Sequence, residues 1–163
     1  MLILGLDPGS RHTGYGLVES QGDTLRAVAY GRFSCPASQA VPARLARLTS
    51  QLAELIEEWR PQIAILETPF HGLNSRSLVV LAQARGALLA ILASHDIEIG
   101  EYSPAEVKSA VAGQGRASKE QVARMVKLQL GLDDELSEDA SDALAMAICF
   151  AQRGRMDRIL GRR

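Results

Sequence analysis

Four carboxylates in this sequence lie at the ends of apolar segments, where an ionised acid is costly unless something compensates its charge. An uncompensated charge beside a protein interior costs at least about a few kcal/mol. Each of these acids therefore needs a partner, such as a cation, a metal ion or several hydrogen-bond donors. The four are Asp7, Glu67, Asp139 and Asp142.

A shared site would explain all four acids at once. If the first and fourth strands of the fold are neighbours and the last helix lies over them, the four side chains converge. Converging carboxylates raise one another's pKa values unless divalent ions absorb the charge. Ligands that are all oxygen suit Mg²⁺ or Mn²⁺ and argue against Zn²⁺. Two such ions about 4 Å apart activate water and stabilise the leaving oxygen at a phosphodiester, so the implied reaction is phosphodiester hydrolysis.

Simpler interpretations of the same acids stay open from the residues alone. Asp7 begins the sequence Asp-Pro-Gly-Ser, in which an aspartate often folds back on its own backbone to open a turn. Asp139 and Asp142 are three residues apart, hence on one helix face, and acids near a helix N-terminus complement its dipole. That explanation suffices for Asp139, whereas Asp142 is followed by an apolar run that disfavours a bare acid.

The elements that must position these acids are three antiparallel strands at the start of the chain, followed by helices and two further strands. Buried strands read as nearly continuous apolar runs, and amphipathic helices repeat apolar residues every three or four positions. Pro42 suits the first turn of a helix, and Ser103 with Glu106 and Ser118 with Gln121 have the spacing of capping boxes. We expect strands at 2–7, 13–18, 24–33, 62–67 and 97–102, and helices at 42–59, 77–94, from 103, 118–130 and 137–152.

Length and composition indicate one α/β domain in a reducing compartment. The 163 residues suit one compact core, which we assign to residues 1–153, followed by a basic, flexible tail at residues 154–163. Cys35 and Cys149 lack metal-ligand spacing, and the apolar run starts directly after Met1, which predicts a cytoplasmic protein without a signal peptide. The net charge of −1 gives no global hint of a polyanionic partner.

The apolar helix expected at 77–94 has two interpretations. Its longest apolar stretch is interrupted by Gln83 and Arg85, so we predict that it does not span a membrane. Ala82, Gly86 and Ala90 repeat at four-residue spacing, which suits a helix covered by the sheet on one face and by a second subunit on another. A plain core helix explains the composition equally well.

The segments LGLDPGSRHTGYG, ILETPF, LAQARG and EDASDALAMA resemble, in order and spacing, the RuvC family of bacterial endonucleases that resolve Holliday junctions. The resemblance implies a ribonuclease H-like fold, with a five-stranded mixed sheet flanked by helices on both faces, and an active homodimer. It also implies a catalytic tetrad that binds two Mg²⁺ ions, with Mn²⁺ as a plausible substitute. The tetrad falls on Asp7, Glu67, Asp139 and Asp142, where some members have His at the position of Asp139.

The same resemblance assigns DNA contacts. Lys108 and Lys119 correspond to basic residues near the cleaved strand, and Lys119 is included among the catalytic groups because it could stabilise developing charge. Phe70 corresponds to an aromatic that packs on an unstacked base, although a buried loop anchor is the simpler alternative. Some members have a Lys where this chain has Leu73, and for the nearby DNA contacts we name Asn74, Arg76 and Arg116. A solvated surface is the usual alternative explanation for such cations.

The resulting hypothesis is a junction resolvase that nicks two opposed strands symmetrically and leaves 5′-phosphate and 3′-hydroxyl ends. Its partners by resemblance are four-way junction DNA and the branch-migration proteins RuvA and RuvB, with no membrane. The alternatives are a junction-binding protein without catalysis and an actin-like phosphotransferase, which would need two such domains. No role is assigned to His12, His71 or the tail.

Overall fold

The computed structural model describes residues 1–68, 75–133 and 135–159 of the chain. In these ranges three strands come first, then a helix, a strand, a helix and a strand in turn, and three helices come last, in the order that the sequence patterns predict. The strands are β1 (Leu2–Asp7), β2 (His12–Gln21), β3 (Thr24–Ser34), β4 (Ile63–Glu67) and β5 (Glu98–Tyr102). The helices are α1 (Val41–Trp59), α2 (Ser75–Ser94), α3 (Pro104–Ala112), α4 (Lys119–Leu130) and α5 (Glu138–Ile159).

β1 lies in the middle of a five-stranded mixed sheet of order β3-β2-β1-β4-β5. It pairs antiparallel with β2 and parallel with β4, so the first and fourth strands are neighbours, as predicted. The parallel register aligns Leu6 with Leu66. The next residue on each strand is Asp7 or Glu67, and both acids therefore leave the sheet at the same end.

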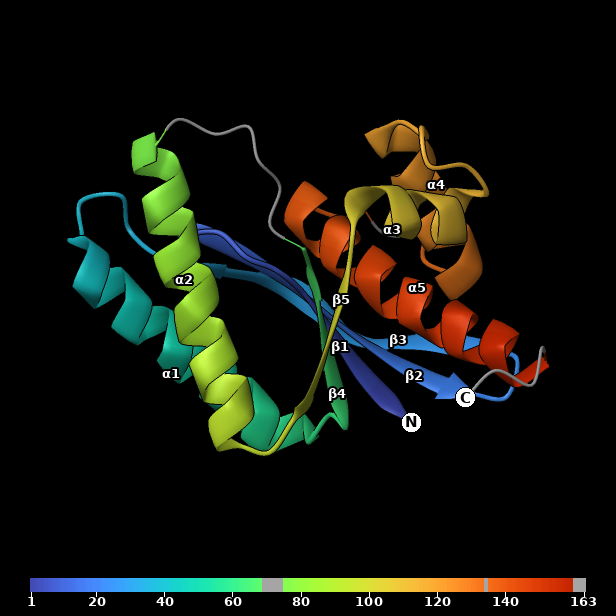
Figure 1. Cartoon of the computed structure of the whole chain (residues 1–163), viewed down its shortest axis with the longest axis horizontal. Helices are drawn as coiled ribbons and strands as arrows, with labels where there is room; N and C mark the ends of the chain where they lie inside the picture. Colours follow the sequence, from blue (N-terminus) through green and yellow to red (C-terminus); the bar gives the residue numbers. More distant parts are fainter. Residues whose placement is uncertain (69–74, 134, 160–163) are drawn as a thin grey trace.

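Helices cover both faces of the sheet (Figure 1). On one face, α1 and α2 bury Leu52 and Leu88 against Leu4, Leu6 and neighbouring strand residues. On the other, α5 lies across β1 and β2, with α3 and α4 packed beside it. The two separate apolar clusters explain why β1 and β4 are apolar at nearly every position, since a central strand presents side chains to both cores.

Glycines allow α5 to lie directly on the sheet. A Cβ atom built on Gly5 would stand 1.8 Å from the carbonyl oxygen of Ala143, and one on Gly14 would stand 2.0 Å from that of Asp139. No side chain fits at either position without moving the helix. The contact sets the distance between β1 and the helix turn that carries Asp139 and Asp142.

The predicted element ends differ from the observed ones mainly at the last helix. The structure continues α5 to Ile159, beyond the end predicted at Gln152, so part of the segment we expected to be a loose tail is helical. Helix-ending signals are weak here, because Gly154 costs only about 1 kcal/mol inside a helix and no proline follows it. Residues 160–163 lie outside the described part of the chain.

Within the described residues, one helix segment, 77–94, has the length and mean hydropathy, 1.7, of a membrane span. A single such helix is weak evidence, because core helices pass the same test. Only 17% of this segment is buried, which disfavours the plain core helix that we considered. Ala84, Leu88 and Leu92 are its buried residues, whereas Ala82, Gly86 and Ala90 of the small-residue row are exposed.

The glycine contact gives a test of the packing. We predict that Gly5→Ala lowers the free energy of unfolding by about 3 kcal/mol, because the added methyl collides with the backbone of α5. Gly154→Ala is the matched control, since nothing lies within 4 Å of its Cβ position and alanine favours the helix. Urea denaturation measures both changes. Equal stability of the Gly5 variant and the wild type would contradict the close packing.

Candidate metal centre and nucleic-acid interface

The end of the sheet where β1 and β4 terminate is hollowed by a pocket of about 260 Å³. Its walls come from five elements, β1, β4, α3, α4 and α5. Three of the four predicted acids and two of the predicted cations line it, together with an apolar floor. The charged lining residues are Asp7, Glu67, Lys108, Lys119 and Asp142.

Asp7 is the acid most perturbed by this environment. Burial is the largest cause, and repulsion from Asp142, Glu67 and Asp139 adds to it, so that the pKa of Asp7 rises to about 7 although Lys119 opposes the shift. Burial and a nearby like charge both disfavour the ionised form of a carboxyl group. Asp7 therefore interacts electrostatically with the other three predicted acids.

Asp7 does not serve as the turn-opening residue. Within the described residues the β1–β2 turn is closed by Thr13, whose buried hydroxyl donates to the carbonyl of Gly9 at 2.7 Å and accepts from its amide at 3.3 Å. The Asp7 carboxylate accepts no hydrogen bond from the turn or from any other described residue. The carboxylate is left available at the pocket.

Glu67 is held at the pocket by an anchor on the strand end that carries it. Arg85 of α2 donates from its guanidinium to the backbone carbonyl of Glu67 at 2.7 Å and pairs with Glu101 on β5. The Thr68 amide also donates to the carbonyl of Tyr102 at 2.9 Å, extending the pairing of β4 with β5. Burial, then repulsion from Asp142, raises the pKa of the Glu67 carboxyl.

Asp142 reaches the pocket from the second turn of α5 and interacts with Lys119 at the start of α4. The Lys119 ammonium donates to Glu138 and stands 3.4 Å from Asp142 Oδ2. The bond to Glu138 is the largest cause that raises the pKa of Lys119, so the lysine stays cationic. Burial raises the pKa of Asp142 despite this cation.

Asp139 occupies a different position from the other three acids. It is not among the residues lining the pocket, and it forms an ion pair with Arg32 of β3 at 3.7 Å. Its negative charge nonetheless helps to raise the pKa of Asp7. The structure thus brings Asp7, Glu67 and Asp142 to one pocket and leaves Asp139 at its margin.

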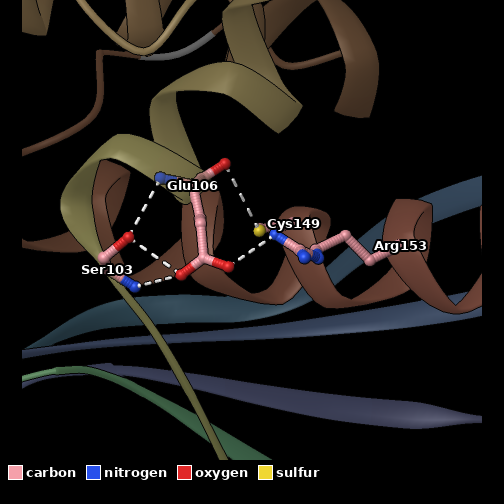
Figure 2. A network of polar contacts seen from close by, with 4 residues as sticks. All are labelled: Ser103, Glu106, Cys149 and Arg153. Carbon is pink, nitrogen blue, oxygen red and sulfur yellow. Dashed lines mark hydrogen bonds and ion pairs between the residues drawn. The ribbon is translucent and has the colours of Figure 1, made fainter.

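Lys108 is positioned by the way α3 is fastened to α5. Figure 2 shows Glu106 accepting from the amide and hydroxyl of Ser103 while its other carboxylate oxygen accepts from Arg153 at 2.8 Å. The Arg153 guanidinium also lies 5.1 Å from the centre of the Tyr102 ring. The capping box predicted at Ser103 therefore also ties β5, α3 and α5 together beside the pocket.

The remaining residues predicted to contact DNA lie away from the pocket or outside the described residues. Arg116 is exposed in the connection between α3 and α4, outside the residues lining the pocket. Phe70 and Asn74 lie outside the described residues, as does His71, and Arg76 is described only as part of α2. His12 begins β2, where its ring nitrogen lies 3.2 Å from the hydroxyl of Ser34.

The donor chemistry of the pocket fits a hard divalent cation. Three carboxylates with raised pKa values line the pocket, and its lining includes no thiol or imidazole. This set of oxygen donors matches the preference of Mg²⁺ and Mn²⁺. As the side chains stand, no group of three or more His, Cys, Asp or Glu residues in the described ranges is arranged to hold a metal ion. Ion binding therefore requires these carboxylates to rotate toward one another.

Several residues that shape the site carried no recognisable signal in the sequence. Arg85 appeared only as a polar interruption in an apolar helix and within the family segment LAQARG, and no role was assigned to it or to Glu138. Arg32 and Arg153 pair with Asp139 and Glu106 from elements remote in sequence. Such long-range ion pairs depend on the register of the sheet and the rotation of α5, which residue spacing does not specify.

Residues 3–150 match the model of one protein family, described as crossover junction endodeoxyribonuclease RuvC. Proteins of that name are similar over nearly the whole chain. One from Bordetella parapertussis is 44% identical, covering 98% of this chain and 90% of its own length. One from Geobacter sp. strain M21 is 42% identical, covering 98% of both.

Solved structures give the same result. The Thermus thermophilus RuvC in complex with Holliday junction substrate is 30% identical and superposes with a TM-score of 0.90, covering 96% of each chain. The yeast mitochondrial Holliday junction resolvase Ydc2 is 15% identical with a TM-score of 0.71, covering 96% of this chain and 80% of its own, which shows a common fold. The ribonuclease H-like fold predicted from the sequence is confirmed.

The raised pKa of Asp7 predicts how stability depends on pH. A folded-state pKa near 7 means that the folded protein binds more protons than the unfolded chain between about pH 4 and pH 7, so stability falls as the pH rises through this range. Asp7→Asn should therefore stabilise the protein by about 4 kcal/mol at pH 8 and by little at pH 4. Urea denaturation in EDTA measures this difference. The control is Glu58→Gln, which changes an exposed carboxylate of α1, and a pH-independent effect of Asp7→Asn would contradict the burial of a charged Asp7.

Proposed function

Because this chain belongs to the RuvC family of crossover junction endodeoxyribonucleases, we propose that it resolves Holliday junctions by metal-dependent hydrolysis of DNA. It nicks two opposed strands of a four-way junction symmetrically and leaves 5′-phosphate and 3′-hydroxyl ends that can be rejoined. The observation that carries this proposal is the meeting of Asp7, Glu67 and Asp142 at one pocket.

The proposed metal ligands are Asp7, Glu67, Asp142 and, from the margin of the pocket, Asp139. Two Mg²⁺ ions, or Mn²⁺ in their place, would supply an activated water and stabilise the leaving oxygen at the scissile phosphodiester. Asp7 is central because its charge interacts with all three other acids. For the metal site to form, Asp142 must give up its ion pair with Lys119 and bind a metal ion instead.

Lys119 and Lys108 act on the DNA side of the pocket. Both are cations that line the same cavity as the acids. Once Lys119 releases Asp142, its ammonium can hold a phosphate oxygen or offset charge that develops during cleavage. Exposed Arg116 adds a backbone contact nearby. These local cations explain how a chain of net charge −1 binds a polyanion.

The loop between β4 and α2 contributes recognition at the junction centre in this proposal. Phe70 packs on an unstacked base, while Asn74 and Arg76 contact the DNA around the crossover. The support for these roles is the family relationship and the position of the sequence directly after Glu67.

A homodimer provides the two active sites needed for symmetrical cleavage. The exposed small residues Ala82, Gly86 and Ala90 on α2 suit close contact with a second copy, because small side chains let two helix backbones approach. In the cell we place the protein in the cytoplasm, acting with RuvA and RuvB. Residues 1–153 form the nuclease domain in this proposal, and residues 154–163 a basic extension.

The central test is cleavage of a synthetic four-way junction in Mg²⁺. We expect Asp7→Asn and Asp142→Asn to bind the junction and cut it at least about 100-fold more slowly, which corresponds to about 3 kcal/mol in the barrier. The cause is loss of an ionised metal ligand without loss of side-chain shape. Gel analysis of product strands measures the rates, and Glu58→Gln should cut as the wild type does.

Two outcomes would contradict these assignments. Wild-type rates for either variant would remove that residue from the catalytic centre. Junction binding without any cutting by the wild type, in Mg²⁺ or Mn²⁺, would favour the alternative of a junction-binding protein without catalysis.

Phe70 is tested separately. We expect Phe70→Ala to retain junction binding, because most affinity comes from phosphate contacts, and to lose at least about tenfold in cutting rate because the junction centre is held less open. Phe70→Trp, which keeps an aromatic face, is the matched control. Unchanged turnover of the alanine variant would return Phe70 to the role of a loop anchor.

A further inference from the structure

A second polar pocket lies at the same end of the sheet as the acidic pocket, on the opposite face. It measures about 560 Å³ and sits between the β1–β2 turn, the first turn of α1 and the first turns of α2. Its polar walls are Ser10, Arg11, Arg44 and Ser77. None of its lining residues lines the acidic pocket. We call it the arginine pocket.

The arginine pocket contains two cations and no acid among its lining residues. Neither Arg11 nor Arg44 forms an ion pair with a carboxylate in the described part of the chain. Other arginines differ: four of them, spread over β3, α2 and α5, each pair with an acid. These are Arg26, Arg32, Arg85 and Arg153.

Arg44 is only partly satisfied by hydrogen bonds within the pocket. Its Nη1 atom lies 3.4 Å from the hydroxyl of Ser10, while its Nε atom is buried with no hydrogen-bond partner among the described residues. An unmet charged donor is costly inside a protein. A guanidinium presents parallel donors that match two oxygens of a phosphate.

The helix starts around the pocket add to its positive potential. Neither α1 nor α2 has an acid in its first turn, and Ala40 gives α1 no side-chain cap. The amide dipoles at such helix starts favour an anion. The arrangement therefore combines two guanidiniums that have no carboxylate partner in the described part of the chain with the start of α1, whose first turn has no acid and no side-chain cap.

The position of the arginine pocket relates it to the acidic pocket. Ser10 follows Asp7 by three residues, so their Cα atoms lie no more than about 11 Å apart. The starts of α1 and α2 and the start of α5 lie at the same end of the molecule, on opposite sides of the sheet (Figure 1). A strand with its scissile phosphate at the acids can thus pass over the end of β1 and place another phosphate against Arg44.

We propose that the arginine pocket is a binding site for a backbone phosphate of the junction DNA, held by Arg11, Arg44 and Ser10. The assignment rests on the proposed function, because the polyanion it binds is the nuclease substrate. The contact is to phosphate alone and carries no base preference. It anchors the strand on the α1 and α2 side of the sheet, while Lys108 and Lys119 hold it on the other side.

Salt dependence of junction binding tests this site. In EDTA, where cutting is suppressed, fluorescence anisotropy with a labelled four-way junction should show Arg11→Gln and Arg44→Gln binding about tenfold more weakly than the wild type. Their slopes of log K against log salt should be smaller by roughly 1, the value of one lost phosphate contact. The control is Arg47→Gln, which removes an exposed charge from the same helix outside the pocket and should keep the wild-type slope.

The outcomes separate this proposal from the proposed function. Wild-type slopes for both pocket variants would overturn the phosphate site and leave the nuclease proposal intact. Binding without cutting by the wild type would overturn the nuclease alone, since the slopes still report on the pocket. Absence of junction binding by the wild type would overturn both. Arg11 is exposed, so its variant tests the site even if Arg44→Gln fails to fold.

Discussion

The burial of a carboxylate among other carboxylates at the end of β1 is the constraint on which the structure of this protein depends. Folding buries Asp7 beside Glu67 and Asp142, and the result is a pKa of about 7 for an acid that ionises near 4 in water. A pocket of this kind is destabilising by itself. Its presence in a domain that otherwise follows simple packing rules supports our proposal that the pocket is the catalytic site.

The rest of the fold holds these acids close together despite the electrostatic cost. Parallel pairing of β1 with β4 aligns two strand ends, and the contact of α5 with Gly5 and Gly14 brings a helix turn onto them. Lys119 supplies part of the compensating charge within the chain. The same end of the sheet has cations on both faces, so the acids lie between two surfaces suited to phosphate.

Much of this arrangement could be predicted from sequence because local patterns specified it. The apolar runs of β1 and β4, the capping boxes at Ser103 and Ser118 and the carboxylate at each strand end predicted the elements and the acids. Features that tertiary contacts decide were not predicted: α5 extends to Ile159, and Arg32 forms an ion pair with Asp139. The arginine pocket was also not predicted, because Ser10, Arg44 and Ser77 are far apart in the sequence and belong to no recognisable motif.

The most direct test of the account is anomalous diffraction from crystals of the protein soaked in Mn²⁺. We predict two manganese peaks about 4 Å apart in the acidic pocket, where the carboxylates of Asp7, Glu67 and Asp142 would hold the ions. Lys119 should have moved away from Asp142. Peaks located elsewhere, or none at the acidic pocket with Asp7 ionised, would contradict the shared metal centre and with it the proposed chemistry.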